Sequence, residues 1–285
     1  MQTTPLMPFS VTFRLLFAVA LLVPAGVAGA QAGGADTTRV SPPVSRSGVA
    51  LLQRGDIGRA GIALALTAAM LPLDRALANR FADTAGLGSP RFKSTAGTLT
   101  AVHERSMLGL SLATFVAGRL VRSRPMADIG LHTAEAVAVG TVIGSLMKST
   151  AGRARPRAAN GNPFDFRFGN GYTSGDYRAF PSLHQIGTFA AAAAITSEAH
   201  RLDGRAGRVA GLVTYGTAGA VGLARMYSAE HWASDVVLGA AIGIGLGKRI
   251  VSHAHGNPTN RLDRVLLGTS GGPEGVSIRL YDRQF

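Results

Sequence analysis

Residues 49–253 form a succession of stretches rich in Ala, Leu, Gly and Val, and each stretch has the length of a helix. The apolar/polar alternation that is typical of a half-buried strand is absent from this region, and so is any repeat of fixed period. The pattern therefore predicts an all-α bundle of about six core helices. The expected helices span residues 56–82, with an interruption near Pro72, and residues 98–121, 127–149, 182–200, 206–227 and 231–252.

The first thirty residues have the features of a secretory signal peptide. Arg14 supplies a positive charge, residues 15–23 are apolar, and Ala28 and Ala30 offer small side chains at the two positions that a signal peptidase reads. We expect cleavage after Ala30 and export of the protein, with a retained membrane anchor as the alternative. Residues 31–48, rich in Gly, Ser, Thr and Pro, are expected to form a flexible leader.

The rest of the chain divides into an all-α domain over residues 49–254 and a tail over residues 255–285. The tail has strand-like segments on both sides of a Gly-Gly-Pro turn, which predicts a short hairpin-like element. Inside the domain, residues 157–180 are polar, rich in Gly and Asn, and contain six aromatic residues. We expect them to form a loop that shapes access to a functional site. A disordered insert is the alternative.

The chain is strongly basic, with 29 Lys and Arg against 16 Asp and Glu and a formal net charge of +13. This charge indicates an anionic partner. Nucleic acid is disfavoured because only 6% of the residues are aromatic and the Arg residues are dispersed. Phosphorylated small molecules and anionic lipid head groups remain. The chain has no Cys, which excludes disulfides, thiol catalysis and Cys-ligated metal sites.

Whether the helices enter a membrane is left open by the sequence. The longest uncharged run has sixteen residues, whereas a spanning helix needs about 20, so the runs favour a soluble or peripheral bundle. Flanking Arg side chains could extend a short span by snorkelling. Small residues four apart fit close packing of transmembrane helices, or simply tight packing in a Gly-rich bundle. They are Gly140/Gly144, Gly207/Gly211 and Gly239/Gly243.

Three short segments carry the residues of a phosphate-handling site. In the first, Lys148 ends an apolar helix and Arg155-Pro156 follows seven residues later, which combines a point charge with a planar fork that matches phosphate oxygens. Taken alone, a basic helix end is ordinary, because cations are favoured near the C-terminus of a helix. The second segment, residues 181–184, places Ser182 at the N-cap of a helix, where its hydroxyl and the free backbone N–H groups can bind an anion.

The second and third segments also supply two imidazoles. His184 lies in the first turn after Ser182, and His231 lies four residues before Asp235, on one face of a helix. A carboxylate in that position can accept from Nδ1–H and leave Nε2 as a nucleophile. Arg225 adds a third cation. Each feature alone has a structural explanation, namely an exposed first-turn His or a stabilising His–Asp pair, but their combination is much more specific.

Together the three segments resemble the signature of the type 2 phosphatidic acid phosphatase and vanadium haloperoxidase superfamily. That signature reads Lys-x6-Arg-Pro, Pro-Ser-x-His and Arg-x5-His-x3-Asp, and all three parts are present here in order, within residues 127–252. The resemblance implies that His231 is a nucleophile that forms a phosphohistidine, that His184 protonates the leaving oxygen and that Asp235 orients His231. It implies no metal and no cofactor for a phosphatase. The implied phosphate-binding residues are Lys148, Arg155, Ser182, Leu183 and Arg225.

Two positions depart from the family pattern. Leu183 replaces the usual Gly between Ser and His, and Ala224 replaces the usual Ser before Arg225. The backbone N–H of Leu183 remains available to phosphate, while its side chain can narrow the pocket or contact an acyl chain. The two imidazoles need opposite protonation states, which predicts a bell-shaped pH profile.

The function expected from these features is that of an exported phosphatase acting on phosphate mono- or diphosphate esters, with a lipid-linked substrate favoured. The site would face the periplasm or exterior, with contact to a membrane surface and no nucleic-acid partner. Three alternatives remain: a soluble acid phosphatase of broad specificity, a vanadate-dependent haloperoxidase, and a non-catalytic binder of anionic lipids. The sequence does not specify the oligomeric state.

Overall fold

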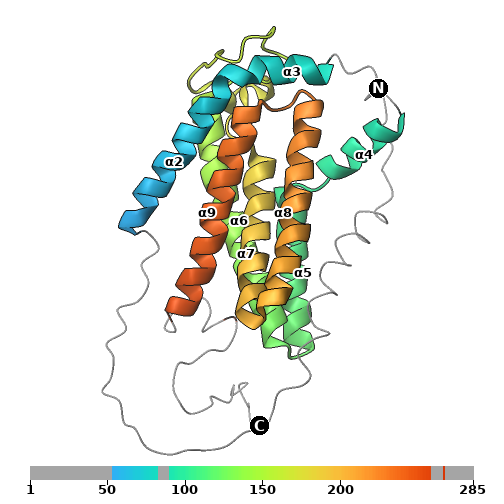
Figure 1. The fold of residues 1–285 in the computed structure, drawn as a ribbon, viewed down its shortest axis with the longest axis vertical. Coiled ribbons are helices and arrows are strands. Elements are labelled where there is room, and N and C mark those ends of the chain that lie inside the picture. Colours follow the sequence, from blue (N-terminus) through green and yellow to red (C-terminus); the bar gives the residue numbers. More distant parts are fainter. Residues whose placement is uncertain (1–52, 83–89, 258–265, 267–285) are drawn as a thin grey trace, which may run out of the picture.

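The computed structural model of the chain describes residues 53–82, 90–257 and 266. In these ranges the regular structure is helical, apart from one isolated β-bridge between Arg153 and Phe166. The all-α prediction is therefore confirmed (Figure 1). The predicted signal peptide, the leader and most of the hairpin-like tail lie outside the described residues.

The helices of the bundle are α2 (Arg54–Met70), α3 (Asp74–Ala82), α4 (Pro90–Thr100), α5 (Glu104–Leu120), α6 (Arg124–Ala151), α7 (Leu183–Leu202), α8 (Gly204–Tyr227) and α9 (Ala233–Gly256). Successive helices from α5 to α9 alternate in direction, so that α7 and α9, which pack against each other, run parallel (Figure 1). Helix α7 packs against α6, α8 and α9 and so forms the centre, while α5 packs on α6 and α2 on α9. The predicted interruption near Pro72 is confirmed by the short 3-10 turn Leu71–Leu73 between α2 and α3.

The predicted helix over residues 98–121 is wrong, because the chain leaves the helical conformation between α4 and α5. His103 is the N-cap of α5 and has an extended backbone. Its Nδ1 atom accepts from the backbone N–H groups of Arg105 at 3.2 Å and Ser106 at 3.3 Å. Histidine is not a preferred N-cap residue, so the sequence carried no clear signal for this break.

Glycines on α9 allow this helix to touch the backbone of α7. A Cβ at Gly239 would lie 2.6 Å from the carbonyl oxygen of Ser182, and a Cβ at Gly243 would lie 2.5 Å from that of Ile186. On the other side of α7, a Cβ at Gly144 would lie 2.5 Å from Cδ1 of Ile186. The small residues recognised in the sequence therefore let α6 and α9 approach the start of α7 closely.

Residues 152–182 connect α6 to α7 and cover the upper end of the bundle in Figure 1. Backbone hydrogen bonds fasten this connection: Arg155 N–H donates to the Asp176 carbonyl at 2.8 Å, and Ala179 N–H donates to the Arg153 carbonyl at 3.0 Å. Two 3-10 turns, Asn170–Tyr172 and Gly175–Tyr177, add local order. The expectation of a loop is consistent with this structure, and a disordered insert is not.

Three helical segments are long and apolar enough to cross a membrane, namely Gly55–Ala82, Arg124–Ala151 and Ala233–Gly256. The uncharged runs in the sequence underestimated the length of these apolar helices. Two of the runs stop at a charged residue, Asp74 or Lys148, that lies within the helical segment. Both side chains are buried in the protein, so neither faces lipid.

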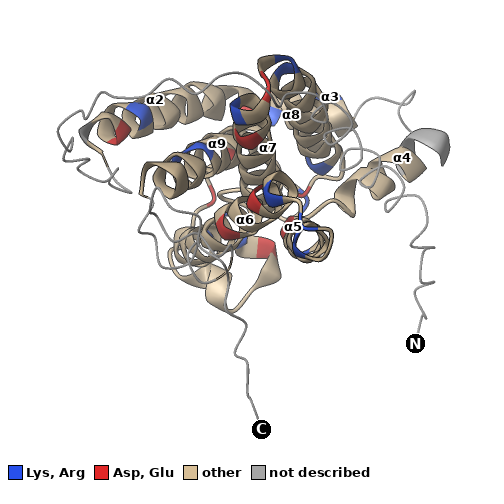
Figure 2. Cartoon of the chain, turned by 90° about the horizontal axis from the view of Figure 1, so that it is seen from below, with Lys and Arg blue, Asp and Glu red and all other residues tan. Residues whose placement is uncertain are grey.

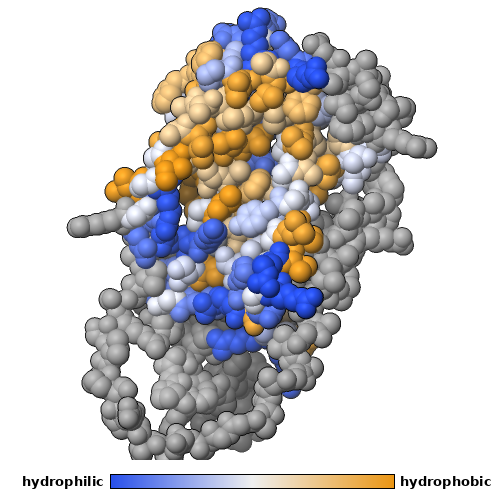
Figure 3. Space-filling model, in the orientation of Figure 1, coloured by the Kyte–Doolittle hydropathy of each residue, from blue (hydrophilic) through white to orange (hydrophobic). Residues whose placement is uncertain are grey.

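Large apolar side chains also lie exposed on several helices, among them Ile57, Leu120 and Leu212. Figure 3 shows apolar residues across much of the upper half of one face, with hydrophilic groups at the two ends. Such an extended apolar surface is typical of contact with a membrane or partner. Together with the three long apolar helices, it indicates that the protein is membrane-associated.

Candidate functional site

The three sequence segments meet at the upper end of the bundle in Figure 1. Lys148 is in the last turn of α6, His184 is in the first turn of α7, Arg225 is in the last turn of α8, and His231 directly precedes α9. Arg155 belongs to the connection between α6 and α7. Segments that are separated by up to about ninety residues in the sequence therefore lie together at one end of the bundle.

Hydrogen bonds join the three segments to one another. The backbone N–H of Ser182 donates to the carbonyl of Asp235 at 3.1 Å, which links the second segment to the third. Arg153, between Lys148 and Arg155, donates from Nη1 to Oδ1 of Asp235 at 2.5 Å, which links the first to the third. These bonds fix the start of α7, the start of α9 and the end of α6 relative to one another.

The ring of His231 is 2% exposed and held in one orientation by the chain just before Ser182. Its Nδ1 atom lies 2.8 Å from the carbonyl oxygen of Ala179. Because a carbonyl can only accept, Nδ1 carries the proton in this contact and Nε2 keeps a free lone pair. Burial and then the nearby cations Lys148, Arg225 and Arg155 hold the pKa of His231 well below its usual value near 6.5.

The hydrogen bond that the sequence assigned to Asp235 is therefore made by a backbone carbonyl. Oδ2 of Asp235 lies 3.7 Å from Nδ1 of His231, beyond hydrogen-bonding distance. Instead, this oxygen accepts from the backbone N–H of Trp232 at 2.7 Å, at the first turn of α9. Asp235 thus holds the chain that carries His231 and makes no hydrogen bond to the imidazole.

Arg153 is a buried residue that sequence reasoning missed. Its side chain is 0% exposed, and its guanidinium donates to Asp235, to Oδ2 of Asp74 at 2.7 Å and to Oγ of Ser234 at 2.7 Å. It also donates to the carbonyl of Pro163. One guanidinium therefore connects α3, the α6–α7 connection and α9 below the site. No local motif could reveal it, because Asp74 lies 79 residues earlier in the chain.

Four cations lie close to one another at this end of the bundle, and three of them, Lys148, Arg155 and Arg225, act electrostatically on His231. Lys148 is 6% exposed, while Arg155 and Arg225 both contact Glu230, with 3.3 Å between Nη2 of Arg225 and Oε2 of Glu230. Burial is the main cause that lowers the pKa of Arg155. Arg178, which the sequence reasoning did not single out, adds charge from the loop and is close enough to act on both Lys148 and Arg155. A carboxylate already lies between two of these guanidinium groups, so the geometry suits an anion.

The start of α7 presents donors to the same region. Ser182 is the N-cap residue, as the sequence predicts, but its hydroxyl makes no capping bond. Its Oγ atom is buried and has no hydrogen-bond partner among the described residues. Buried hydroxyls are normally hydrogen-bonded, so this oxygen and the backbone N–H groups of Leu183 and His184 are arranged for a ligand.

His184 is near two residues of α5 that the sequence did not connect with it. Its Nδ1 lies 3.9 Å from Oε2 of Glu104, and its ring lies edge-on to that of His103, with 6.0 Å between centroids. Burial, followed by the charges of Arg225 and His231, lowers the pKa of His184 to about 2. Arg225 and Lys148 act electrostatically on both imidazoles, which is consistent with the two rings lying near the same cations.

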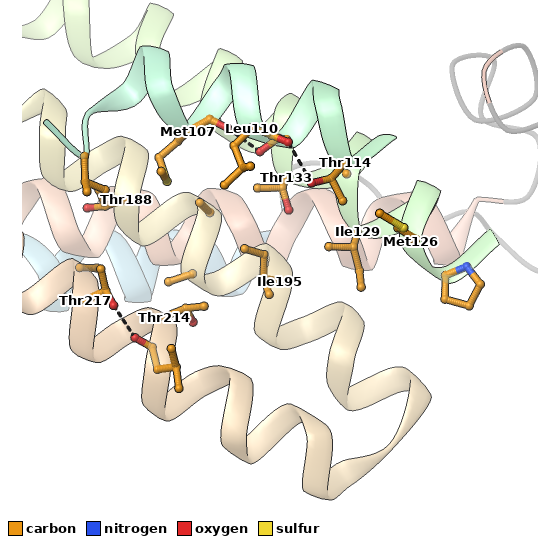
Figure 4. A pocket seen from close by; sticks show the side chains of 18 of the residues that line it. Met107, Leu110, Thr114, Met126, Ile129, Thr133, Thr188, Ile195, Thr214 and Thr217 are labelled. Carbon is orange, nitrogen blue, oxygen red and sulfur yellow. Dashed lines mark hydrogen bonds between the residues drawn. The ribbon is translucent and has the colours of Figure 1, made fainter. Parts of the chain in front are cut away.

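An apolar cavity of about 320 Å³ begins one helical turn from His184 and extends between α5, α6, α7 and α8 (Figure 4). Five of the hydroxyl groups that line it donate to the carbonyl four residues earlier in their own helix, whereas the Oγ1 atom of Thr133 has no partner among the described residues. The five belong to Ser111, Thr114, Thr188, Thr214 and Thr217. The cavity therefore offers a mainly hydrocarbon surface next to a strongly cationic site.

Comparisons with known proteins bear on the family and on the fold. Residues 130–257 match the family model of the PAP2 superfamily. The fold is similar to the crystal structure of a transmembrane PAP2 type phosphatidylglycerolphosphate phosphatase from Bacillus subtilis, with a TM-score of 0.55 and 17% sequence identity. The match covers 72% of this chain and 97% of that chain. No curated protein matches the sequence.

Proposed function

We propose that the protein is a phosphatase that hydrolyses phosphate esters of membrane lipids through a phosphohistidine on His231, and the match of residues 130–257 to the PAP2 superfamily model supports this. The observation that carries this proposal is the proximity of a buried, cation-rich site to an apolar cavity whose lining includes Thr188, one helical turn after His184. The first suits a phosphate group and the second suits an acyl chain. The similarity in fold to a phosphatidylglycerolphosphate phosphatase supports the same substrate class.

In the proposed first step, Nε2 of His231 attacks the phosphorus atom, and the bond from phosphorus to the lipid oxygen breaks. The contact of Nδ1 with the Ala179 carbonyl keeps the lone pair on Nε2. Lys148, Arg155 and Arg225 neutralise the charge that develops on the phosphoryl oxygens. The hydroxyl of Ser182 and the backbone N–H groups at the start of α7 bind the same oxygens.

The leaving oxygen receives its proton from His184. In the absence of phosphate this imidazole is neutral near pH 7, because burial and the surrounding cations lower its pKa to about 2. A bound phosphate anion reverses the local charge and favours protonation of His184. In the second step, His184 takes a proton from water, which attacks the phosphohistidine and releases inorganic phosphate.

The lipid part of the substrate is proposed to occupy the apolar cavity (Figure 4). A small phosphate ester would gain nothing from this cavity, so the cavity favours a lipid phosphatase over a soluble acid phosphatase of broad specificity. The three helices that are long and apolar enough to cross a membrane support an enzyme that works at a membrane, where such substrates are found. We propose, from the signal peptide expected in residues 1–30, that the site faces the exterior.

Paired substitutions in α5 test this proposal. Leu110 lines the cavity, whereas Leu112 on the same helix is 46% exposed and does not line it. We expect Leu110→Trp to lower kcat/KM about tenfold or more for phosphatidate and phosphatidylglycerol phosphate in mixed micelles, because lost apolar contact in a pocket has effects of this size. Turnover of p-nitrophenyl phosphate should not change, and Leu112→Trp should change neither.

Two results would count against the lipid assignment. One is an equal loss with both substrate types in Leu110→Trp. The other is a wild-type enzyme that hydrolyses p-nitrophenyl phosphate as efficiently as the lipids. His231→Asn should abolish phosphate release from every substrate, and retained turnover in that variant would contradict the nucleophile assignment.

A further inference from the structure

A second cluster of polar side chains lies inside the bundle at the end opposite the phosphate site. It consists of His132 of α6, Glu198 of α7 and His255 of α9. His132 precedes Lys148 by sixteen residues on one helix, which corresponds to about 24 Å along the axis. The view from below in Figure 2 looks onto this end, where the three helices lie together. The cluster is therefore separate from the catalytic groups.

The three side chains bring their donor atoms together. Nδ1 of His132 lies 2.5 Å from Oε1 of Glu198, and Nε2 of His255 lies 2.9 Å and 3.0 Å from the two carboxylate oxygens. One donor atom from each residue lies within 4.8 Å of the others. His132 and Glu198 are 1% and 3% exposed, while the His255 side chain is 24% exposed. The cluster thus has a closed interior and one side open to solvent.

The geometry points to a binding site for a divalent transition-metal ion, with Zn²⁺ as the best match, held by His132, Glu198 and His255. Two imidazole nitrogens and one carboxylate are a ligand set that zinc uses in proteins. Metal–ligand bonds of 2.0–2.1 Å in a tetrahedron place ligand atoms about 3.3 Å apart. To reach that value, the His132–Glu198 pair must open by about 0.8 Å from 2.5 Å, and the His255–Glu198 pair by about 0.3 Å from 3.0 Å.

A nearby carboxylate favours a doubly charged ion over an uncharged ligand. Asp128 lies one turn before His132 on α6 and acts electrostatically on the cluster. Its Oδ1 atom is buried without a hydrogen-bond partner in the described part of the chain, and its Oδ2 atom is 3.9 Å from Arg124. Glu198 and Asp128 place two carboxylates at this end of the bundle, and their combined charge matches that of one divalent cation. The ion would join α6, α7 and α9 and stabilise the fold, without a part in the phosphatase reaction.

Metal content of the full-length protein tests this site. The protein, purified in detergent without a histidine tag, is treated with a chelator, incubated with Zn²⁺, freed of excess metal and analysed by mass spectrometry. We expect one Zn²⁺ per chain in the wild type, a large loss in Glu198→Gln and His255→Ala, and no loss in His253→Ala. His253 is the matched control because it lies on α9 two residues before His255 and outside the cluster.

Co²⁺ provides a second measurement that needs no variant. Bound at this site, it should give the intense visible absorption of a four-coordinate ion, and Zn²⁺ should remove that absorption and raise the thermal-unfolding midpoint. The proposal is overturned if the wild type retains no stoichiometric metal, or if Glu198→Gln and His255→Ala retain as much as the wild type. It is also overturned if Co²⁺ gives only the weak spectrum of the hydrated ion. The cluster would then be a hydrogen-bonded His–Glu–His group.

Discussion

Replacement of Arg153 by Met removes the buried cation beneath the phosphate site. The guanidinium is 0% exposed and is the cationic partner of two carboxylates, Asp74 at 2.7 Å and Asp235 at 2.5 Å, which are also fully buried. Removing one partner of a buried ion pair costs about 3–5 kcal/mol, because the remaining charge is left without compensation. Since two carboxylates lose their partner here, we expect a loss of about 5 kcal/mol in the free energy of unfolding.

This loss should lower the thermal-unfolding midpoint by about 10–20 °C, given a shift of about 2–4 °C per kcal/mol for a domain of this size. Fluorescence can follow it, because Trp232 is the only tryptophan in the chain and its ring lies 5.5 Å from the Arg153 guanidinium. Arg157→Met is the control: the Arg157 side chain is 45% exposed and contacts Asp176 at 2.7 Å and Glu230 at 3.2 Å. An exposed pair of this kind contributes about 0–1 kcal/mol.

Adding Asp74→Asn to Arg153→Met should restore part of the lost stability, because the second change removes one of the two unpaired charges. The reasoning is refuted if Arg153→Met unfolds at the same temperature as Arg157→Met. It is equally refuted if Asp74→Asn further destabilises Arg153→Met.

Three further predictions concern the site and the bundle. The acid limb of the single-turnover pH profile should have its midpoint below pH 6.5, because the lowered pKa of His231 keeps the nucleophile neutral in mild acid. A midpoint above pH 6.5 would contradict this. Gly243→Ala should destabilise the protein by about 1–3 kcal/mol in thermal unfolding, because the added methyl group overpacks against α7. Gly245→Ala is the control: its Cβ would have nothing within 4 Å, so this change should be neutral or stabilising. Glu230→Gln should strengthen inhibition by inorganic phosphate, because it removes the carboxylate that competes for Arg155; an unchanged inhibition constant would exclude that competition.

The sequence was sufficient to predict the elements that local patterns determine. Apolar stretches of helical length predicted α6, α7, α8 and α9 to within a few residues, and Pro72 marked the break between α2 and α3. The segments that carry Lys148, His184 and His231 were recognised because their spacing is specific. Their convergence at one end of the bundle follows from α6 ending where α7 and α9 begin.

Features that depend on contacts across the fold were not predictable in this way. Asp74 and Arg153 form a buried pair although neither belongs to a local pattern with the other. The Ala179 carbonyl takes the Nδ1–H of His231 because the loop folds back onto α9, whereas the sequence showed only that Asp235 was four residues away. His103 and Glu104 reach His184 through an unusual N-cap, and His132, Glu198 and His255 meet without any spacing that indicates a metal site.

The phosphorylation state of His231 during turnover tests the central claim most directly. Wild-type protein is mixed with a radiolabelled lipid phosphate, denatured in alkali within the first turnover, digested and sequenced by mass spectrometry. We predict an acid-labile, alkali-stable phosphate on the peptide that contains His231, with none in His231→Asn. Labelling of another residue, or complete turnover with no labelled enzyme at any time, would contradict the account.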